Sequence, residues 1–298
     1  MHMKKRYLFF AALALMLTAC SDESTLDMLG MVSPNGETVK VRFAESMEYN
    51  ESVGEIHLDM HSDDYVIYVC SDSHITRKTH KNLDHFMAQY SAVKAPKFAL
   101  HLGDVIDAQK NLPCADSIIH TGRTLNDTMF VTLGNHDIYF KQWEIFRSFF
   151  KTSVYWFDTR NGSKPLDLFI CLDSAEGTLG ADQLKWLRDL LADKSKEGYR
   201  KIIVYTHTHF WKLDGSQGHT SNLAIEETYE LCSLLADHGV NYVWTGHQHA
   251  RQSVIQRGVH YLVLDATKDS ESGQSYMTVD MSNEGAVFHF HEYPAIND

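Results

Sequence analysis

Histidines, aspartates and one asparagine recur in short groups along the 298-residue chain, and each group directly follows an apolar run. In residues 133–137 (LGNHD), a glycine is followed by an amide, an imidazole and a carboxylate. Carboxylates and imidazoles bind divalent metal ions and transfer protons. We therefore expect metal-dependent chemistry if the fold brings the groups together. The other groups are Asp72-Ser73-His74, Gly103-Asp104-Val105-Ile106-Asp107, His207-Thr208-His209 and Gly246-His247-Gln248-His249.

The apolar runs before these groups predict buried strands at residues 65–70, 98–102, 129–132, 201–206 and 242–245. Enzymes of the α/β class place their chemistry at the carboxyl ends of such strands. Because side chains alternate along an extended chain, we expect Asp72 and His74 to point the same way, and likewise His247 and His249. We expect Gly134 to provide backbone angles that other residues avoid.

The remaining patterns complete one catalytic domain, which we assign to residues 61–298. Helical spacing predicts helices at about 77–93, 139–150, 180–191 and 224–238, and the aromatic face of the second is more typical of core than of a cofactor contact. Residues 20–60 are interpreted as a tether with N-terminal strands. The further predicted strands lie at 39–43, 56–60, 154–157, 168–172, 259–264, 276–281 and 287–291.

The first residues predict export. Three basic residues at positions 4–6 precede an apolar run, 7–17, that is too short for a permanent membrane span. Residues 17–20 (LTAC) resemble the lipobox of bacterial lipoproteins, which implies a signal peptide at 1–19 and a lipid anchor on Cys20; a simple secretion signal is the alternative. The acidic segment after Cys20 resembles those that send some lipoproteins outward. We therefore expect the outer membrane or cell surface rather than the inner membrane.

Net charge and cysteine content limit the ligands and the metal sites that we expect. A net charge of −12 argues against nucleic acid, because binding to a phosphate backbone depends on Lys and Arg. A small phosphate ester remains compatible, since bound cations can supply positive charge locally. Cys70 and Cys171 lie inside predicted strands, where export permits a disulfide and burial as small core residues is the alternative. No C-x-x-C pair is present, which disfavours a thiolate zinc site.

The five groups, in this order and each after a strand, resemble the calcineurin-like metallophosphoesterase superfamily from about residue 65 to 249. The pattern Gln183-x-x-Trp186-Leu187, which follows Asp173-Ser174, is also similar to many bacterial members. The resemblance implies an α/β fold, a four-layer α-β-β-α sandwich with a dinuclear metal site at the carboxyl ends of the central strands.

The resemblance also implies two metal ions, divalent or trivalent, from among Mn, Fe and Zn. It implies that Asp104 bridges them, a position that suits a carboxylate because its two oxygens partly neutralise two cations. The nucleophile would be a hydroxide bridging the ions. The other implied ligands are Asp72, His74 and His249 for one ion, and Asn135, His207 and His247 for the other.

Two further residues receive catalytic roles from the resemblance. His136 would be no ligand, but would stabilise the transition state or protonate the leaving alkoxide. Asp107 is similar to the carboxylate that orients that imidazole. Asp137 has the weakest claim and is interpreted as a brace for the loop.

His209 competes with His207 as the ligand of the second ion, and its alternative position is facing the substrate, where Asn135 is also a candidate contact. We prefer His207 as the ligand because family members usually use the first histidine after this strand. Family members often have a proline after that histidine, whereas Phe210-Trp211 follow here, which leaves the substrate pocket undefined. The histidines interpreted as packing residues are His101, His219, His289 and His291.

The predicted function is hydrolysis of a small phosphate ester, either a monoester or a diester. The protein Ser/Thr phosphatase branch has arginine after the position of Asp107, where this chain has Ala108, and purple acid phosphatases have tyrosine at position 107 itself. Neither branch is favoured. The alternatives are a catalytically silent phosphate-ligand-binding protein of the envelope and a nuclease of the same superfamily. The oligomeric state is not indicated.

Overall fold

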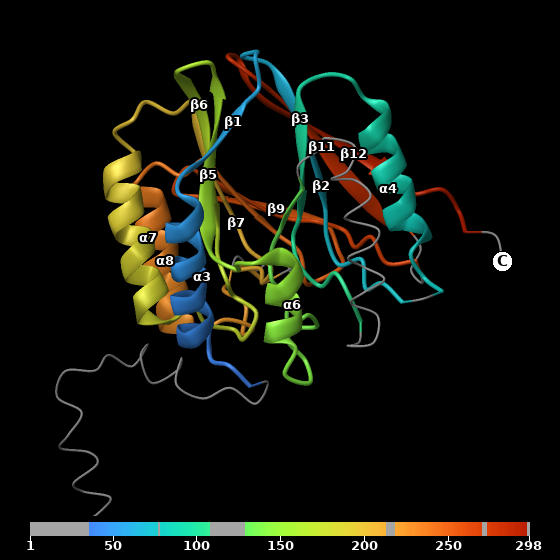
Figure 1. The fold of residues 1–298 in the computed structure, drawn as a ribbon, viewed down its shortest axis with the longest axis horizontal. Helices are drawn as coiled ribbons and strands as arrows, with labels where there is room; N and C mark the ends of the chain where they lie inside the picture. Colours follow the sequence, from blue (N-terminus) through green and yellow to red (C-terminus); the bar gives the residue numbers. More distant parts are fainter. Residues whose placement is uncertain (1–35, 77, 108–128, 213–217, 270–272, 297–298) are drawn as a thin grey trace, which may run out of the picture.

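Two β-sheets pack face to face in the computed structural model, and helices cover their outer faces (Figure 1). The structure describes residues 36–76, 78–107, 129–212, 218–269 and 273–296. The strand order is β1-β5-β6-β7-β8-β10-β9 in the seven-stranded sheet and β12-β11-β2-β3-β4 in the five-stranded sheet. The layered α/β architecture predicted from the sequence is confirmed.

The seven-stranded sheet contains a parallel block, β6, β7, β8 and β10, whose strands all run toward the same edge. On one side of this block β5 is antiparallel to β6, and on the other β9 is antiparallel to β10. The strands are β1 (Ile56–Asp59), β5 (Tyr155–Asn161), β6 (Lys164–Cys171), β7 (Lys201–Tyr205), β8 (Tyr242–Thr245), β9 (Gln252–Gln256) and β10 (Val259–Val263).

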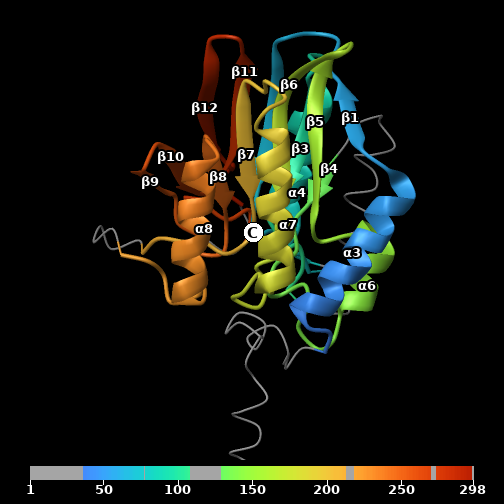
Figure 2. The same ribbon diagram turned by 90° about the vertical axis from the view of Figure 1, so that its left-hand side faces the viewer.

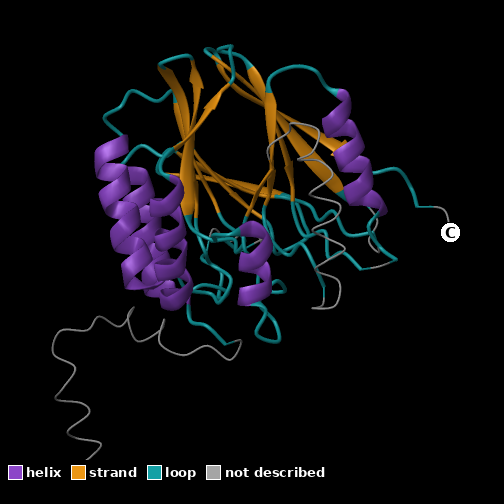
Figure 3. Cartoon of the chain, in the orientation of Figure 1, coloured by secondary structure: helices purple, strands orange, loops and turns teal. Residues whose placement is uncertain are grey.

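The five-stranded sheet has β2, β3 and β4 parallel to one another, with β11 antiparallel to β2 and β12 antiparallel to β11. Loops gather at one end of the two sheets (Figure 3), and the loops after β2, β3 and β4 lie there. The strands are β2 (Tyr65–Cys70), β3 (Lys97–His101), β4 (Met129–Val131), β11 (Ser275–Ser282) and β12 (Gly285–Glu292).

The helices complete the outer layers. Figure 2 shows α8, α7 and α3 side by side over the seven-stranded sheet, while α4 covers the outer face of the five-stranded sheet (Figure 1). The predicted aromatic face of α6 is buried, as expected for core residues. The helices are α3 (Val39–Val53), α4 (Lys81–Ala92), α6 (Trp143–Phe150), α7 (Gly180–Lys194) and α8 (Ile225–Asp237).

The core between the two sheets is built from the inward faces of their strands. Ile67 and Leu100 of one sheet and Phe169 and Trp244 of the other belong to a single buried cluster. Each such side chain contributes about 1.5–3 kcal/mol of burial free energy. Cys70 and Cys171 are buried free thiols, which agrees with the interpretation as small core residues and excludes a disulfide between them.

The prediction of a strand at residues 39–43 is wrong, because these residues begin the helix α3. The side chain of Thr38 accepts a hydrogen bond from the amide of Val41 and caps the helix. The buried positions, Val39, Arg42 and Ser46, have helical spacing, but two of them are polar. Apolar alternation over five residues therefore indicated the wrong period. Strand β9 was also not predicted.

Among the described helices, none combines the length and the apolar composition that a membrane crossing requires. Cys20 and the predicted signal peptide lie outside the described residues.

Candidate metal centre

The loops after β2, β3, β4, β7 and β8 bring all seven predicted metal ligands together, along with His136 and Asp107. The backbone achieves this by left-handed turns rather than by strand alternation, which corrects the expectation for the D-x-H and H-x-H pairs. Strand β2 ends at Cys70, and β8 ends at Thr245. Left-handed conformations in residues other than glycine cluster at functional sites, where the surroundings hold them. The φ angles are positive at Asp72, His74, Asp104, His247 and His249.

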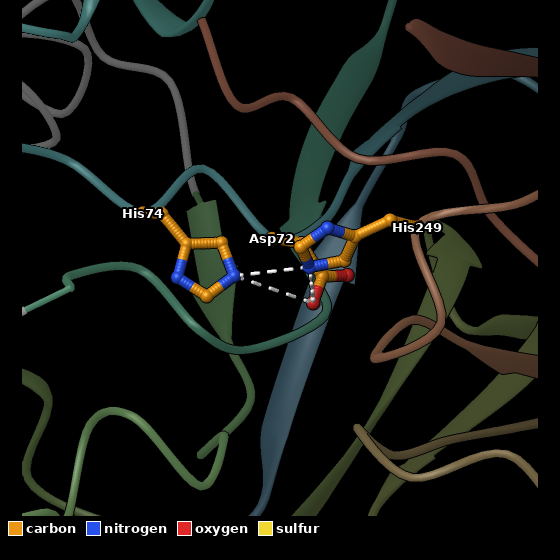
Figure 4. Close-up of side chains that lie close together, drawn as sticks. All are labelled: Asp72, His74 and His249. Atoms are coloured by element: carbon orange, nitrogen blue, oxygen red, sulfur yellow. Dashed lines mark hydrogen bonds and ion pairs between the residues drawn. The ribbon is translucent and has the colours of Figure 1, made fainter. Parts of the chain in front are cut away.

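The first donor group consists of Asp72, His74 and His249 (Figure 4). The Nε2 atoms of the two histidines lie 3.1 Å apart, and His249 Nε2 lies 3.4 Å from Asp72 Oδ1. Asp72 is buried and also accepts hydrogen bonds from the amide of His247. Two ring nitrogens and a carboxylate oxygen are thus directed at one point.

The second donor group consists of Asp104, His207 and His247, with Asn135 beside them. His207 Nε2 lies 3.3 Å from Asp104 Oδ2 and 3.2 Å from His247 Nδ1. Asn135 Oδ1 lies 3.1 Å from His207 Nε2 and 3.0 Å from His247 Nδ1. This is the set that the family resemblance implied for the second ion.

Asp104 lies between the two groups. Its Oδ2 atom is 3.6 Å from His74 Nε2 and 3.3 Å from His207 Nε2, one nitrogen from each group. Its Oδ1 atom accepts a hydrogen bond of 2.8 Å from the backbone amide of His136. The carboxylate is therefore fixed in a position from which it can serve both groups.

Glycines make this close approach possible. A Cβ atom on Gly134 would lie 2.1 Å from the Asp104 amide nitrogen and 2.2 Å from its Oδ1. A Cβ atom on Gly246 would lie 2.3 Å from Asp72 Oδ2. Gly134 does not have a positive φ, so the expected reason for this glycine is wrong: it provides space for Asp104, not an unusual backbone angle.

The electrostatics of the groups fit cations. Burial lowers the pKa of His74 and of His247 to about 4, so both imidazoles are neutral at pH 7 and keep a lone pair for coordination. Burial alone would raise the pKa of Asp104, but the charge and the hydrogen bond of His207, together with the charges of His74 and His136, outweigh burial and lower the pKa. Burial alone would lower the pKa of His207, but Asp104 raises it to about 10.

The close contacts between donor atoms are those expected of residues that bind cations. The facing nitrogens of His74 and His249 can be reconciled only by a proton or a cation between them. The proton that His207 shares with Asp104 occupies a place that a cation can take. Imidazole nitrogens and carboxylate oxygens are the donor types that suit Zn, Fe and Mn. The residues present therefore fit bound metal ions.

His136 and Asp107 form the rim of the centre. His136 Nδ1 lies 3.3 Å from Asp107 Oδ1, and the same carboxylate oxygen lies 3.6 Å from His74 Nδ1. The side chain of His136 is 30% exposed and that of Asp107 is 45% exposed, whereas the Asp72, Asp104 and His207 side chains are at most 3% exposed. The imidazole is thus accessible to a ligand entering from solvent, beside the metal donors.

Asp137 braces the loop that carries Asn135 and His136. Its side chain is buried and accepts hydrogen bonds from the amides of Gly134, at 2.9 Å, and Ile106, at 3.2 Å. Burial raises its pKa to about 8. These contacts agree with the interpretation of Asp137 as a structural residue.

Two further histidines near the site, His209 and His101, differ in their surroundings. His209 belongs to neither donor group, although its buried ring lies 5.8 Å from that of His247. Its Nδ1 atom has no hydrogen-bond partner within the described part of the chain. His101 is fully buried, and its Nε2 pairs with Ser73 Oγ at 2.9 Å, which agrees with a packing role.

Two supporting residues of the site were not predicted. The hydroxyl of Tyr139 accepts a hydrogen bond of 2.8 Å from Asn135 Nδ2, which orients the Asn135 carbonyl oxygen toward the histidines. The hydroxyl of Ser71 donates to Asp72 Oδ2. Both are close in sequence to a predicted ligand, but tyrosine and serine next to a motif carry no distinctive signal of their own.

Comparison with known proteins agrees with the site. The family model for calcineurin-like phosphoesterases matches residues 65–251. No curated protein sequence matches the chain.

Solved structures share the fold. "GAP50 the anchor in the inner membrane complex of Plasmodium" is 15% identical, with a TM-score of 0.56 over 78% of this chain and 85% of that one. Purple acid phosphatase PPD1 from yellow lupin is 11% identical, with a TM-score of 0.58 over 78% of this chain and 52% of that one. PhoD is 10% identical, with a TM-score of 0.51 over 77% and 69%. At these identities the likeness extends to the fold alone.

Proposed function

The chain belongs to the calcineurin-like phosphoesterase family, and from that premise we propose that it is a metal-dependent hydrolase of small phosphate esters. The observation that carries the proposal is the position of Asp104 between two complete donor groups. A protein without one of the two groups could still bind a phosphate ligand but would lack the metal pair for catalysis. Here both groups are present, and the imidazole of His136 beside them is accessible. The substrate is a monoester or a diester.

The two donor groups are suited to a pair of ions of Mn, Fe or Zn. Asp72, His74 and His249 would hold one ion, and Asn135, His207 and His247 would hold the other, with Asp104 shared. When bound, such ions neutralise phosphate oxygens and lower the pKa of water so that a nucleophile exists near neutral pH. An acidic protein can therefore bind an anionic ester at this point.

His136 is assigned the proton transfer to the leaving group. Its Nδ1 faces Asp107, which leaves Nε2 to donate a proton to the ester oxygen as the bond to phosphorus breaks. Asp107 faces Nδ1 and is assigned to holding the ring in that orientation. His209, buried near His247 and outside both donor groups, is assigned to the substrate side of the site.

The site of action is proposed to be the bacterial envelope, with a lipid on Cys20 as the anchor. The support is the lipobox-like LTAC sequence at residues 17–20 after a short apolar run. The outer membrane or cell surface is favoured by the acidic residues that follow. Labelling with a radioactive fatty acid tests this directly: incorporation is expected in the natural chain and lost in Cys20→Ala.

A second candidate is a binding protein of this fold without catalysis. One protein of similar fold, from Plasmodium, is described as an anchor, so the fold also occurs under a description that names no reaction. The complete donor set and His136 favour the enzyme here. A nuclease is disfavoured by the net charge of −12.

The experiment that separates these candidates is a substrate screen. Protein loaded with Mn, Zn or Fe is assayed on p-nitrophenyl phosphate, bis(p-nitrophenyl) phosphate, nucleotides, sugar phosphates and single-stranded and plasmid DNA. We expect turnover of one class of small ester and none of DNA. Tight phosphate binding without turnover on any ester would establish the binding protein, and cleavage of DNA would establish the nuclease.

A further inference from the structure

We infer that Arg42 positions the donor group that contains His207, through a buried chain of hydrogen bonds that begins on α3. Arg42 precedes the residues that the family model matches, which start at residue 65. The inference rests on the proposed function, since it concerns how firmly one of the two ion sites is built.

The chain begins with a two-point contact between side chains that are both completely buried. Arg42 Nε lies 2.8 Å from Asp173 Oδ2, and Arg42 Nη2 lies 3.1 Å from Asp173 Oδ1. The remaining nitrogen, Nη1, donates to the carbonyl oxygen of Glu37 and to Glu176 Oε2. A paired guanidinium and carboxylate in this geometry define direction as well as distance.

Asp173 transmits this restraint to the loop that follows β6. Its Oδ1 accepts a hydrogen bond from the amide of Ala175, and its Oδ2 accepts one from the hydroxyl of Ser153. Its own amide donates to Gln183 Oε1 of α7 at 2.8 Å. The backbone is therefore held on both sides of Ser174.

Ser174 then fixes both neighbours of His207. Its hydroxyl oxygen accepts hydrogen bonds from Thr206 Oγ1, at 2.7 Å, and from the amide of Thr208, at 2.9 Å. Its carbonyl oxygen accepts a third, of 3.0 Å, from Thr208 Oγ1. All three contacts are buried, so water does not compete for them.

Loss of these contacts should weaken the donor group that contains His207 more than the group that contains His249. His207 Nε2 lies within 3.3 Å of Asp104 Oδ2 and 3.1 Å of Asn135 Oδ1, so a small shift of its backbone opens the second donor group. The first group comes from the loops after β2 and β8, and it is one step further from Ser174: the loop after β8 contacts His207 through the hydrogen bond of 3.0 Å from the amide of Gly246 to the His207 carbonyl oxygen. Partners that orient metal ligands typically change metal affinity by about 10- to 100-fold.

A second pair of an arginine with a buried aspartate, on β6, supplies a control. Arg200 contacts both carboxylate oxygens of Asp167, whose side chain is buried, near the beginning of β6. Asp167 is opposite Lys201 at the first residue of β7, at the end of the sheet away from His207. Arg200 thus pairs with a residue in the first half of β6, whereas Arg42 pairs with a residue just beyond its end.

The experiment compares Arg42→Lys, Ser174→Ala and Arg200→Lys by calorimetric titration of the metal-free protein with Mn²⁺, together with thermal unfolding. Ser174→Ala removes a single hydroxyl and gives an answer even if lysine at position 42 prevents folding. We expect the natural protein to bind two ions. In Arg42→Lys and Ser174→Ala we expect one ion to bind about 10- to 100-fold more weakly and the other unchanged.

Arg200→Lys is expected to lose thermal stability and to keep both affinities. Equal affinities in all proteins, or an equal loss of affinity in Arg200→Lys, would overturn the inference. A natural protein that binds two Mn²⁺ ions but hydrolyses no ester contradicts the proposed function alone. A natural protein that binds no Mn²⁺, Zn²⁺ or Fe²⁺ contradicts both.

Discussion

The Nε2 atoms of His74 and His249, whose residues are 175 positions apart in the chain, face each other at 3.1 Å. One nitrogen comes from the loop after β2 in one sheet and the other from the loop after β8 in the other sheet. Two neutral imidazoles gain nothing from this approach unless a proton or a cation lies between them. The contact therefore fits a proton or a cation held between the two sheets.

The shared carboxylate gives the first prediction. Asp104→Asn keeps the shape of the side chain but removes the negative charge between the two groups, so both ions should bind more weakly. We expect metal content after dialysis to fall from two ions to fewer than one, as measured by atomic spectroscopy, and hydrolysis to fall at least about 100-fold. Asp189→Asn, on an exposed side chain of α7, is the control and should retain both ions. Retention of two ions by Asp104→Asn would contradict the shared role.

The assigned acid gives the second prediction. His136→Ala should retain both ions, because His136 is in neither of the two ligand sets proposed for them, although it lies with Asp107 and His74 in a third cluster of potential donors. It should lower kcat about 10²- to 10⁴-fold for an alkyl phosphate, whose leaving oxygen needs a proton. The loss should be much smaller for p-nitrophenyl phosphate, whose leaving group departs as the anion. Equal losses on both substrates would assign His136 to a role other than proton transfer.

Crowding at Gly134 gives the third prediction. A methyl group in Gly134→Ala would meet the backbone of Asp104, so the loop or the carboxylate must move. We expect a loss of about 1–3 kcal/mol in the free energy of unfolding, with weaker metal binding. Gly162→Ala also places a methyl group on a turn, but in open space and at positive φ, so it should cost about 1 kcal/mol and leave metal binding unchanged. Unfolding in urea and metal titration measure the two effects.

The fourth prediction concerns pH and a residue away from the site. Burial between Tyr242 and Phe288 lowers the pKa of His260 below the value of about 6.5 in an unfolded chain. The unfolded state therefore binds more protons between these two values, and the stability that neutral His260 contributes is present above pH 6.5 and declines as the pH falls. Glutamine does not titrate, so His260→Gln lacks this pH-dependent contribution to stability.

The stability gap between the natural protein and His260→Gln should therefore narrow from pH 7.5 to pH 5.5 in urea unfolding. Val53→Ala, at a residue that is 48% exposed, changes no titrating group, serves as the control and should keep a constant gap. A gap for His260→Gln that widens at low pH would mean that folding raises the pKa of His260 instead of lowering it.

The sequence was sufficient to predict which strands carry the site. Each ligand group follows a strongly apolar run. Parallel strands of one sheet must end at the same edge, so the proximity of the groups after β2, β3 and β4, and of those after β7 and β8, could be inferred within each sheet. The way the pairs converge could not be inferred: Asp72 and His74 have left-handed backbone angles that depend on hydrogen bonds from other loops, such as the amide of His247 to Asp72.

The helix α3 shows why other features were missed. Its buried face includes Arg42 and Ser46, whose partners Asp173 and Ser153 lie more than a hundred residues away. A local hydrophobic pattern cannot reveal a buried polar side chain whose partner comes from another part of the chain. The same reason hides Ser174, although the Asp173-Ser174 pair was noted as a resemblance.

If two metal ions at this site support hydrolysis of a phosphate ester, the activity of the metal-free protein should depend on the ions added to it. Protein stripped with a chelator is titrated with Mn²⁺, Zn²⁺ or Fe²⁺ while hydrolysis of the best ester from the screen is followed. We predict no activity without metal and a rise that levels off at two equivalents of ion. Full activity in the stripped protein, or two bound ions with no hydrolysis of any phosphate ester, would exclude metal-dependent ester hydrolysis at this site.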